Sequence, residues 1–188
     1  KDRVSYLKLR NFSRGLIVGT TLLLLTLLVP AVYRWLTQTL LQLPAEVADL
    51  TYGALWFFLP WPSAIGYRRF LQGVLIRAGK TRLVAIGTLI RLLGMTVAGL
   101  LGYLLLDIPG AWVGGLALGT GVTVEAIAAR FMAAETVRDL LAGEGDFEHT
   151  GRKITYRVIA AFYLPLALTS LIGLTIQPLL TFFMGRSV

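Results

Sequence analysis

Hydrophobic residues gather into five long blocks along the chain, separated by shorter polar segments. The blocks cover about residues 15–36, 49–78, 83–106, 111–138 and 154–183. Each block is long enough to cross a hydrocarbon layer of about 30 Å as an α-helix. The pattern therefore predicts an all-α membrane protein with about five transmembrane helices.

The second block is the least regular because Pro60 and Pro62 stand near its middle. Each proline removes a helical hydrogen bond and pushes against the preceding turn, so we expect a kink or a local unwinding there. Irregular backbone at membrane depth is tolerated where it lines a cavity. The two prolines therefore predict a break that lies beside a cavity.

Composition and charge agree with a membrane protein. The 188 residues are 56% hydrophobic and 15% charged, whereas soluble domains contain about 25% charged residues. The net charge of +8 does not indicate nucleic-acid binding, because the basic residues stand at block ends, where membrane topology favours them. The sequence contains no cysteine, which excludes disulfides and thiolate metal sites.

Basic residues are concentrated in alternate loops, with Arg34 as the one exception. Because cytoplasmic loops are enriched in Lys and Arg, this alternation predicts a multi-pass protein with a cytoplasmic N-terminus and Val188 outside. We expect its location to be the plasma membrane, namely the bacterial inner membrane. The basic residues of the predicted cytoplasmic segments lie before the first block (Lys1, Arg3, Lys8, Arg10, Arg14), between the second and third blocks (Arg77, Lys80, Arg82), and between the fourth and fifth blocks (Arg138, Arg152, Lys153, Arg157).

Small residues recur at helical spacing in the third and fourth blocks. Such residues let two helix backbones approach closely in lipid. We therefore expect them to form packing faces and assign them no chemistry. They are Ala98 and Gly102, Gly110 and Gly114, and Gly115 and Gly119.

Two local patterns resemble functional motifs but lack the required context. Residues 79–81 resemble the end of a phosphate-binding loop, but Val74 stands where that loop needs a glycine, and no strand precedes it. His149 stands among acidic residues in a polar loop, where a metal would want ligands from an ordered scaffold. We therefore expect no cofactor and no metal. No cluster of catalytic residue types is visible in the blocks, so we do not expect an enzyme.

Charged residues within the blocks are the candidate functional residues, because a charge near the bilayer centre costs about 2.5 to 3.5 kcal/mol. Arg68 lies nine residues before Arg77, and Arg91 lies nine residues after Arg82. At a rise of 1.5 Å per residue, both lie roughly 13 Å from the membrane boundary, at one depth. Glu125, in the fourth block, is positioned to face either arginine.

Arginines outnumber the single glutamate at this depth. Arg68, Arg69, Arg91 and Arg130 cannot all be paired with Glu125, so a water-filled cavity of positive potential, which attracts anions, is the simplest arrangement. The structural alternative is a buried ion pair that holds the helices together, with Arg69 or Arg130 extending towards lipid headgroups.

The order and spacing of several segments resemble the multidrug, oligosaccharidyl-lipid and polysaccharide exporter (MATE-like) superfamily, and within it the progressive ankylosis type. The segments are the basic lead Arg10 to Arg14 and residues 73–82, 110–115, 162–168 and 177–178. The resemblance implies a fragment of a two-bundle transporter. Residues 1–141 would form four helices of the first bundle, 142–153 a cytoplasmic linker, and 154–188 the first helix of the second bundle.

These observations together predict a secondary transporter or flippase piece that moves an anionic solute or an anionic lipid-linked precursor by alternating access. Arg68, Arg69 and Arg91 would bind the substrate phosphate or carboxylate. Glu125 would orient an arginine or carry a coupling proton. The expected partners are the lipid bilayer, the substrate and the missing helices of a parent protein, with no nucleic acid.

Two alternatives remain open at this point. An organic cation (multidrug) antiporter would need acidic residues in its cavity, whereas the blocks offer only Glu125, with Glu135 near the inner end. A membrane scaffold that transports nothing would use its arginines for lipid phosphates or for assembly.

Overall fold

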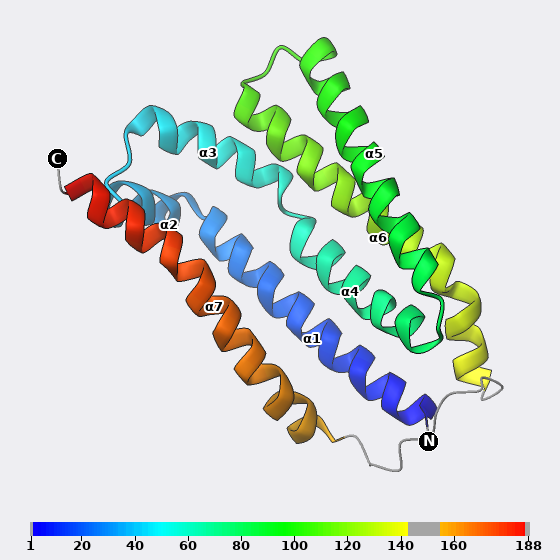
Figure 1. Cartoon of the computed structure of the whole chain (residues 1–188). Helices are drawn as coiled ribbons and strands as arrows, with labels where there is room; N and C mark the ends of the chain where they lie inside the picture. Colours follow the sequence, from blue (N-terminus) through cyan, green and yellow to red (C-terminus); the bar gives the residue numbers. More distant parts are fainter. Residues whose placement is uncertain (1, 143–154, 187–188) are drawn as a thin grey trace.

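The protein is an all-α membrane protein. A computed structural model describes residues 2–142 and 155–186, with side chains from residue 3 to 142 and from 155 to 176. Within these ranges there is no strand. The helices are α1 (Asp2–Leu28), α2 (Pro30–Arg34), the π-helix η1 (Trp35–Leu40), α3 (Ala45–Phe57), α4 (Trp61–Arg77), α5 (Thr81–Leu105), α6 (Gly110–Ala142) and α7 (Tyr156–Arg186) (Figure 1).

Four helices of the described part are long and apolar enough to cross a membrane, namely α1, α5, α6 and α7. They correspond to the first, third, fourth and fifth predicted spans. The second span is divided between α3, of 13 residues, and α4, of 17 residues. The chain is therefore a multi-pass membrane protein. The predicted linker at 142–153 lies almost wholly outside the described residues.

Helix α1 differs from the first predicted span at both ends. It begins at Asp2 instead of residue 15, because the polar lead contains neither proline nor glycine and continues the helix, although hydropathy detects only its apolar part. It ends at Leu28 instead of residue 36. Val29 precedes Pro30 and adopts extended angles (φ −62°, ψ 122°), as the steric effect of a following proline favours.

The predicted break in the second span is confirmed at Phe58–Pro60. These residues form a turn in which the Trp61 amide donates to the Phe58 carbonyl (2.9 Å). Pro60 is the N-cap of α4 and Pro62 lies in its first turn, where a proline loses no helical hydrogen bond. Pro60 also lines two cavities beside α6. The expectation of a break next to a cavity is therefore correct.

The segment that resembled a phosphate-binding loop is instead a helix stop. Gly79 has a positive φ of 72°, which glycine adopts without a steric penalty. The Lys80 amide donates to the Leu75 carbonyl (2.9 Å), which is the hydrogen bond of a Schellman cap. This turn reverses the chain from α4 into α5.

The helices pack around α4 and α6. Helix α4 contacts α1 and α6, while α6 also contacts α5 along an extended seam and α3 near its start. The start of α1, the α4–α5 turn and the end of α6 meet at one end of the molecule (Figure 1). We call this the basic end, since it carries Arg3, Lys8, Arg77, Lys80, Arg82 and Arg138.

Hydrogen bonds from aromatic side chains to backbone carbonyls fasten the opposite end. The Tyr33 hydroxyl donates to the Ala48 carbonyl (2.7 Å), and the Tyr52 hydroxyl donates to the Leu28 carbonyl (2.9 Å). Such partners are expected for buried phenols. They connect α2, α3 and the end of α1.

Small residues allow close helix contacts, as expected. A Cβ added at Gly115 would lie 3.0 Å from the Ala54 carbonyl oxygen, and one at Gly119 would overlap the Phe57 carbonyl oxygen. Gly102 similarly faces Val113. The prediction of packing faces is therefore confirmed at Gly102, Gly115 and Gly119. It is wrong at Gly110 and Gly114, where an added Cβ has nothing within 4 Å.

Replacing Gly119 with alanine is expected to lower the free energy of unfolding by about 1–3 kcal/mol, because α3 must move away from α6. Gly114→Ala is the matched control on the same helix and should cause no loss. The measurement is unfolding by sodium dodecyl sulfate in mixed micelles, followed by tryptophan fluorescence. Equal stability of the two variants would contradict the close α3–α6 contact.

Candidate functional site

Three consecutive residues of α4 direct their side chains to three different sides. Successive residues of an α-helix are turned by about 100°. Tyr67 lines a pocket between α1, α4 and α6, Arg68 is buried against Glu125 of α6, and Arg69 lines a groove on another side of α4. The charged residues of this stretch therefore belong to separate sites.

Arg68 and Glu125 form a buried ion pair. The Arg68 Nη1 donates to the Glu125 Oε2 at 2.6 Å, and the two side chains are 8% and 0% exposed. A carboxylate without access to water needs hydrogen-bond donors and a compensating charge. The short charge-assisted hydrogen bond supplies both.

Two further side chains converge on Glu125. The Gln72 Nε2 donates weakly to the Glu125 Oε1 (3.4 Å). The Arg91 Nε lies 3.8 Å from the Glu125 Oε2, and the Arg91 side chain is 32% exposed. The two arginines and the one glutamate of this cluster leave a net charge of +1.

The predicted site residues are only partly brought together. The expectation that Glu125 faces Arg68 or Arg91 is confirmed, and it contacts both. Arg69, by contrast, is exposed on another side of α4 and does not take part in the cluster. The predicted role of these four residues in substrate binding stays a prediction.

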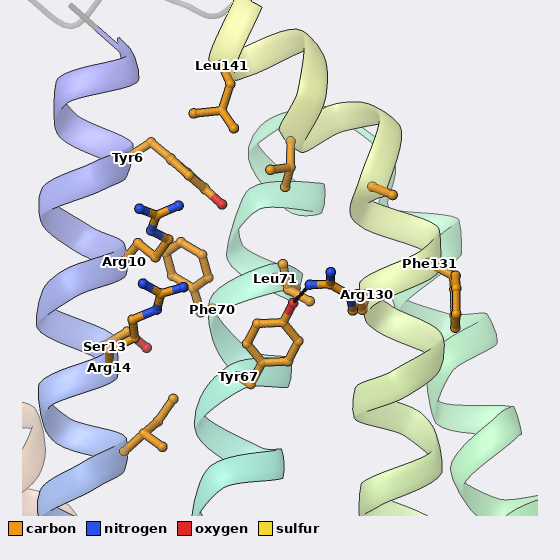
Figure 2. A pocket seen from close by; sticks show the side chains of 13 residues that line it. Tyr6, Arg10, Ser13, Arg14, Tyr67, Phe70, Leu71, Arg130, Phe131 and Leu141 are labelled. Atoms are coloured by element: carbon orange, nitrogen blue, oxygen red, sulfur yellow. Dashed lines mark hydrogen bonds between the residues drawn. The ribbon is translucent and has the colours of Figure 1, made fainter.

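A cationic pocket of about 430 Å³ lies between α1, α4 and α6. In Figure 2 the guanidinium groups of Arg10 and Arg14 extend from α1 towards α4, and Arg130 extends from α6. The other lining residues that can form hydrogen bonds are Tyr6, Ser13 and Tyr67. The remaining walls are apolar and comprise Ile17, Phe70, Leu71, Phe131, Ala134, Val137 and Leu141.

Among the residues that the structure describes, no aspartate or glutamate lines this pocket. Its three guanidinium groups therefore create a positive potential that no carboxylate of the lining offsets. The Arg10 Cζ lies 5.8 Å from the centroid of the Tyr6 ring, close enough for a cation–π contact. The buried Arg10 Nε has no hydrogen-bond partner within the described residues. The pocket thus offers an unused donor as well as charge.

A hydrogen bond between Arg130 and Tyr67 closes one side of the pocket. The Arg130 Nη1 donates to the Tyr67 hydroxyl oxygen at 3.0 Å (Figure 2). Both residues also line a second cavity of about 320 Å³, which continues along α4 and α6 to Pro60 and Thr123. The bond therefore lies at the boundary between two cavities that follow the same pair of helices.

Sequence reasoning did not identify this pocket. It interpreted Arg10 and Arg14 as topological signals before the first span and as part of the family resemblance, whereas α1 carries both as helical residues. Their spacing of four residues places them on one helix face. That periodicity, together with Tyr6, Ser13 and Ile17, is the signal that would have revealed a face directed at a pocket.

Glu125→Gln is expected to lower the free energy of unfolding by about 3 kcal/mol, because it leaves Arg68 buried without a compensating charge. The matched control is Glu135→Gln, since Glu135 pairs with Lys80 at 3.2 Å but is 68% exposed. The decrease in the free energy of unfolding caused by Glu135→Gln should stay below about 1 kcal/mol.

Detergent-induced unfolding of both variants and of the double variant Arg68→Met/Glu125→Met checks this expectation. The double variant should recover part of the lost stability, because neither charge remains buried alone. Equal effects of Glu125→Gln and Glu135→Gln would contradict a structural role for the buried pair.

The function has to be inferred from the chemistry of these side chains. Comparison of the chain with protein-family models, with curated proteins and with solved structures gives no match.

Proposed function

We propose that the protein is a secondary transporter or flippase, or part of one, that moves an anionic solute or an anionic lipid-linked precursor by alternating access. The observation that carries the proposal is the pocket lined by Arg10, Arg14 and Arg130, to whose lining the described part of the chain contributes no carboxylate. Intramembrane charges commonly mark substrate and ion pathways. A cavity that carries three unneutralised cations concentrates anions.

The donors of the pocket suit phosphate or carboxylate. Guanidinium groups bind both anions through paired, charge-assisted hydrogen bonds. Ser13 and Tyr67 add hydroxyl groups that can donate to further oxygens. The apolar walls reduce competition from water, which strengthens each of these contacts.

We assign the basic end to the cytoplasm of a bacterial inner membrane. Support comes from the Lys and Arg residues that gather there, in keeping with the enrichment of such residues in cytoplasmic loops. In this orientation the pocket lies in the cytoplasmic half of the helices, and the second cavity leads towards the outside.

The MATE-like resemblance fits this proposal. In it, α1 and α3–α6 belong to the first helical bundle and α7 begins the second. The exposed Arg14, Arg130 and Phe131 at the pocket would then face the second bundle, which would complete the transport path. Alternating access would bring the two bundles together or apart at this side of the pocket.

We assign Arg68, Gln72, Arg91 and Glu125 to the support of this site. Support comes from the Arg68–Glu125 pair, which fixes the rotation of α4 and thereby the direction of the neighbouring Tyr67. The same pairing argues against an organic cation antiporter, because Glu125 is already engaged by two arginines. Orientation of arginines therefore suits Glu125 better than cation binding.

Arg10→Gln and Arg14→Gln are each expected to lower anion flux at least tenfold, because each removes one of three cations from the pocket. The measurement is flux of labelled phosphorylated and carboxylated solutes in vesicles that carry the full-length protein. Arg82→Gln is the control, since it removes the same charge at the same end outside the pocket.

Arg68→Gln and Arg91→Gln distinguish anion binding in the pocket from anion binding at the buried cluster around Glu125. If the pocket binds the anion, folded Arg91→Gln protein should keep more flux than Arg10→Gln protein. Unchanged flux in all the pocket variants, or flux of organic cations only, would contradict the proposal. Loss of assembly in place of flux would indicate a scaffold.

Tyr67→Phe is expected to raise the KM for the anion about fivefold, because the hydroxyl both holds Arg130 and can donate to the anion. Tyr52→Phe is the control, since its hydroxyl bonds to the backbone at the opposite end. Flux measured over a range of anion concentrations distinguishes the two. An unchanged KM for Tyr67→Phe would exclude Tyr67 from the binding site.

A further inference from the structure

A basic groove lies on the other side of the α1–α4 contact from the pocket. Tyr6 and Phe70 line both, and their rings pack at a centroid distance of 5.4 Å. This aromatic pair therefore separates the pocket from the groove. The groove has a volume of about 290 Å³ and lies towards the basic end, between α1 and α4.

The groove combines cations with apolar walls. Arg69 and Arg77 line it, whereas no aspartate or glutamate whose side chain the structure describes does. Leu9 of α1 and Val74 of α4 are among its apolar residues. A ligand that fits it therefore carries a negative group and an apolar part.

Arg69 lies deeper than the end of α4. It stands eight residues before Arg77, which corresponds to about 12 Å along the helix axis. The Cα–Cβ bonds of a helix tilt towards its N-terminus, so the side chain starts in the direction away from the basic end. Arg69 is thereby directed away from the headgroup layer, so an anionic headgroup has to be drawn down between the helices to reach it.

Arg69 is exposed and makes no hydrogen bond or ion pair with any residue that the structure describes. An arginine at membrane depth without an anion costs about 2.5 to 3.5 kcal/mol. An anion supplied by the membrane itself would remove much of this cost.

Gly73 keeps the space beside Arg69 open. It lies on α4 between the two arginines and lines the groove, and a Cβ added there would meet nothing within 4 Å. A larger side chain at this position would fill the groove without changing its charge.

We propose that this groove binds an anionic phospholipid, with its phosphate held by Arg69 and Arg77 and an acyl chain along Leu9 and Val74. Paired guanidinium groups suit phosphate, and anionic lipids are attracted to basic residues at the membrane surface. The proposal is independent of transport, because none of the cationic residues of the pocket takes part.

The test uses full-length protein in nanodiscs of phosphatidylcholine, with or without phosphatidylglycerol. The readouts are the difference in Tm between the two compositions and the number of lipids retained in native mass spectrometry. For each variant, the Tm in pure phosphatidylcholine is subtracted from the Tm with phosphatidylglycerol, so that a change in the basal stability of the variant cancels.

Arg69→Gln and Gly73→Leu should both abolish the Tm increase caused by phosphatidylglycerol and remove one retained lipid. Arg82→Gln and Gly19→Leu are the charge and size controls, because neither residue lines the groove and Gly19 is open and exposed. Both controls should keep the increase, as should the pocket variant Arg10→Gln.

An equal loss in Arg69→Gln and Arg82→Gln would overturn the proposal in favour of diffuse attraction between the basic end and the membrane. An equal Tm increase from inorganic phosphate in pure phosphatidylcholine would overturn it in favour of a soluble anion. If Gly73→Leu protein kept the Tm increase caused by phosphatidylglycerol, this groove would be excluded as the lipid-binding site.

Discussion

A carboxylate that cannot reach water governs the arrangement of the described helices. Glu125 is fully buried, so α4 has to present Arg68 to it, and that requirement fixes the rotation of α4. Because successive residues differ by about 100°, Tyr67 and Arg69 are then directed to two other sides. One ion pair thus determines which part of α4 faces the pocket and which part faces the groove.

The arginines of the molecule fall into environments of different chemical character. Arg68 is neutralised within the protein, which makes it a structural element whose loss exposes a buried charge. Arg10 and Arg14 lie on α1 in a pocket, and Arg69 lies in a groove, and neither lining contains an acid among the described residues. Unlike Arg68, these three arginines contribute little to the stability of the fold and leave donors available to ligands.

The depth of the charged residues along the helices could be predicted from the sequence, whereas the side of the helix to which each side chain points could not. Counting residues from the loops placed Arg68 and Arg91 at one level, and the structure brings Glu125 to both. The same count gives Arg69 nearly the same level, although its side chain lies in a different groove. Hydropathy located the spans and the proline break, but it treated the polar start of α1 as a loop and so missed the pocket.

Contacts on both sides of Arg10 and Arg14 hold α1 against α4. On one side, a Cβ on Gly66 would overlap Ile17. On the other side, the Tyr6 ring packs against Phe70 at a centroid distance of 5.4 Å. Arg10 and Arg14 thus stand on a segment of one uninterrupted helix that is fastened at both of its ends. The width of the pocket is therefore set by the packing of α1 against α4, and no carboxylate has to hold either arginine in place.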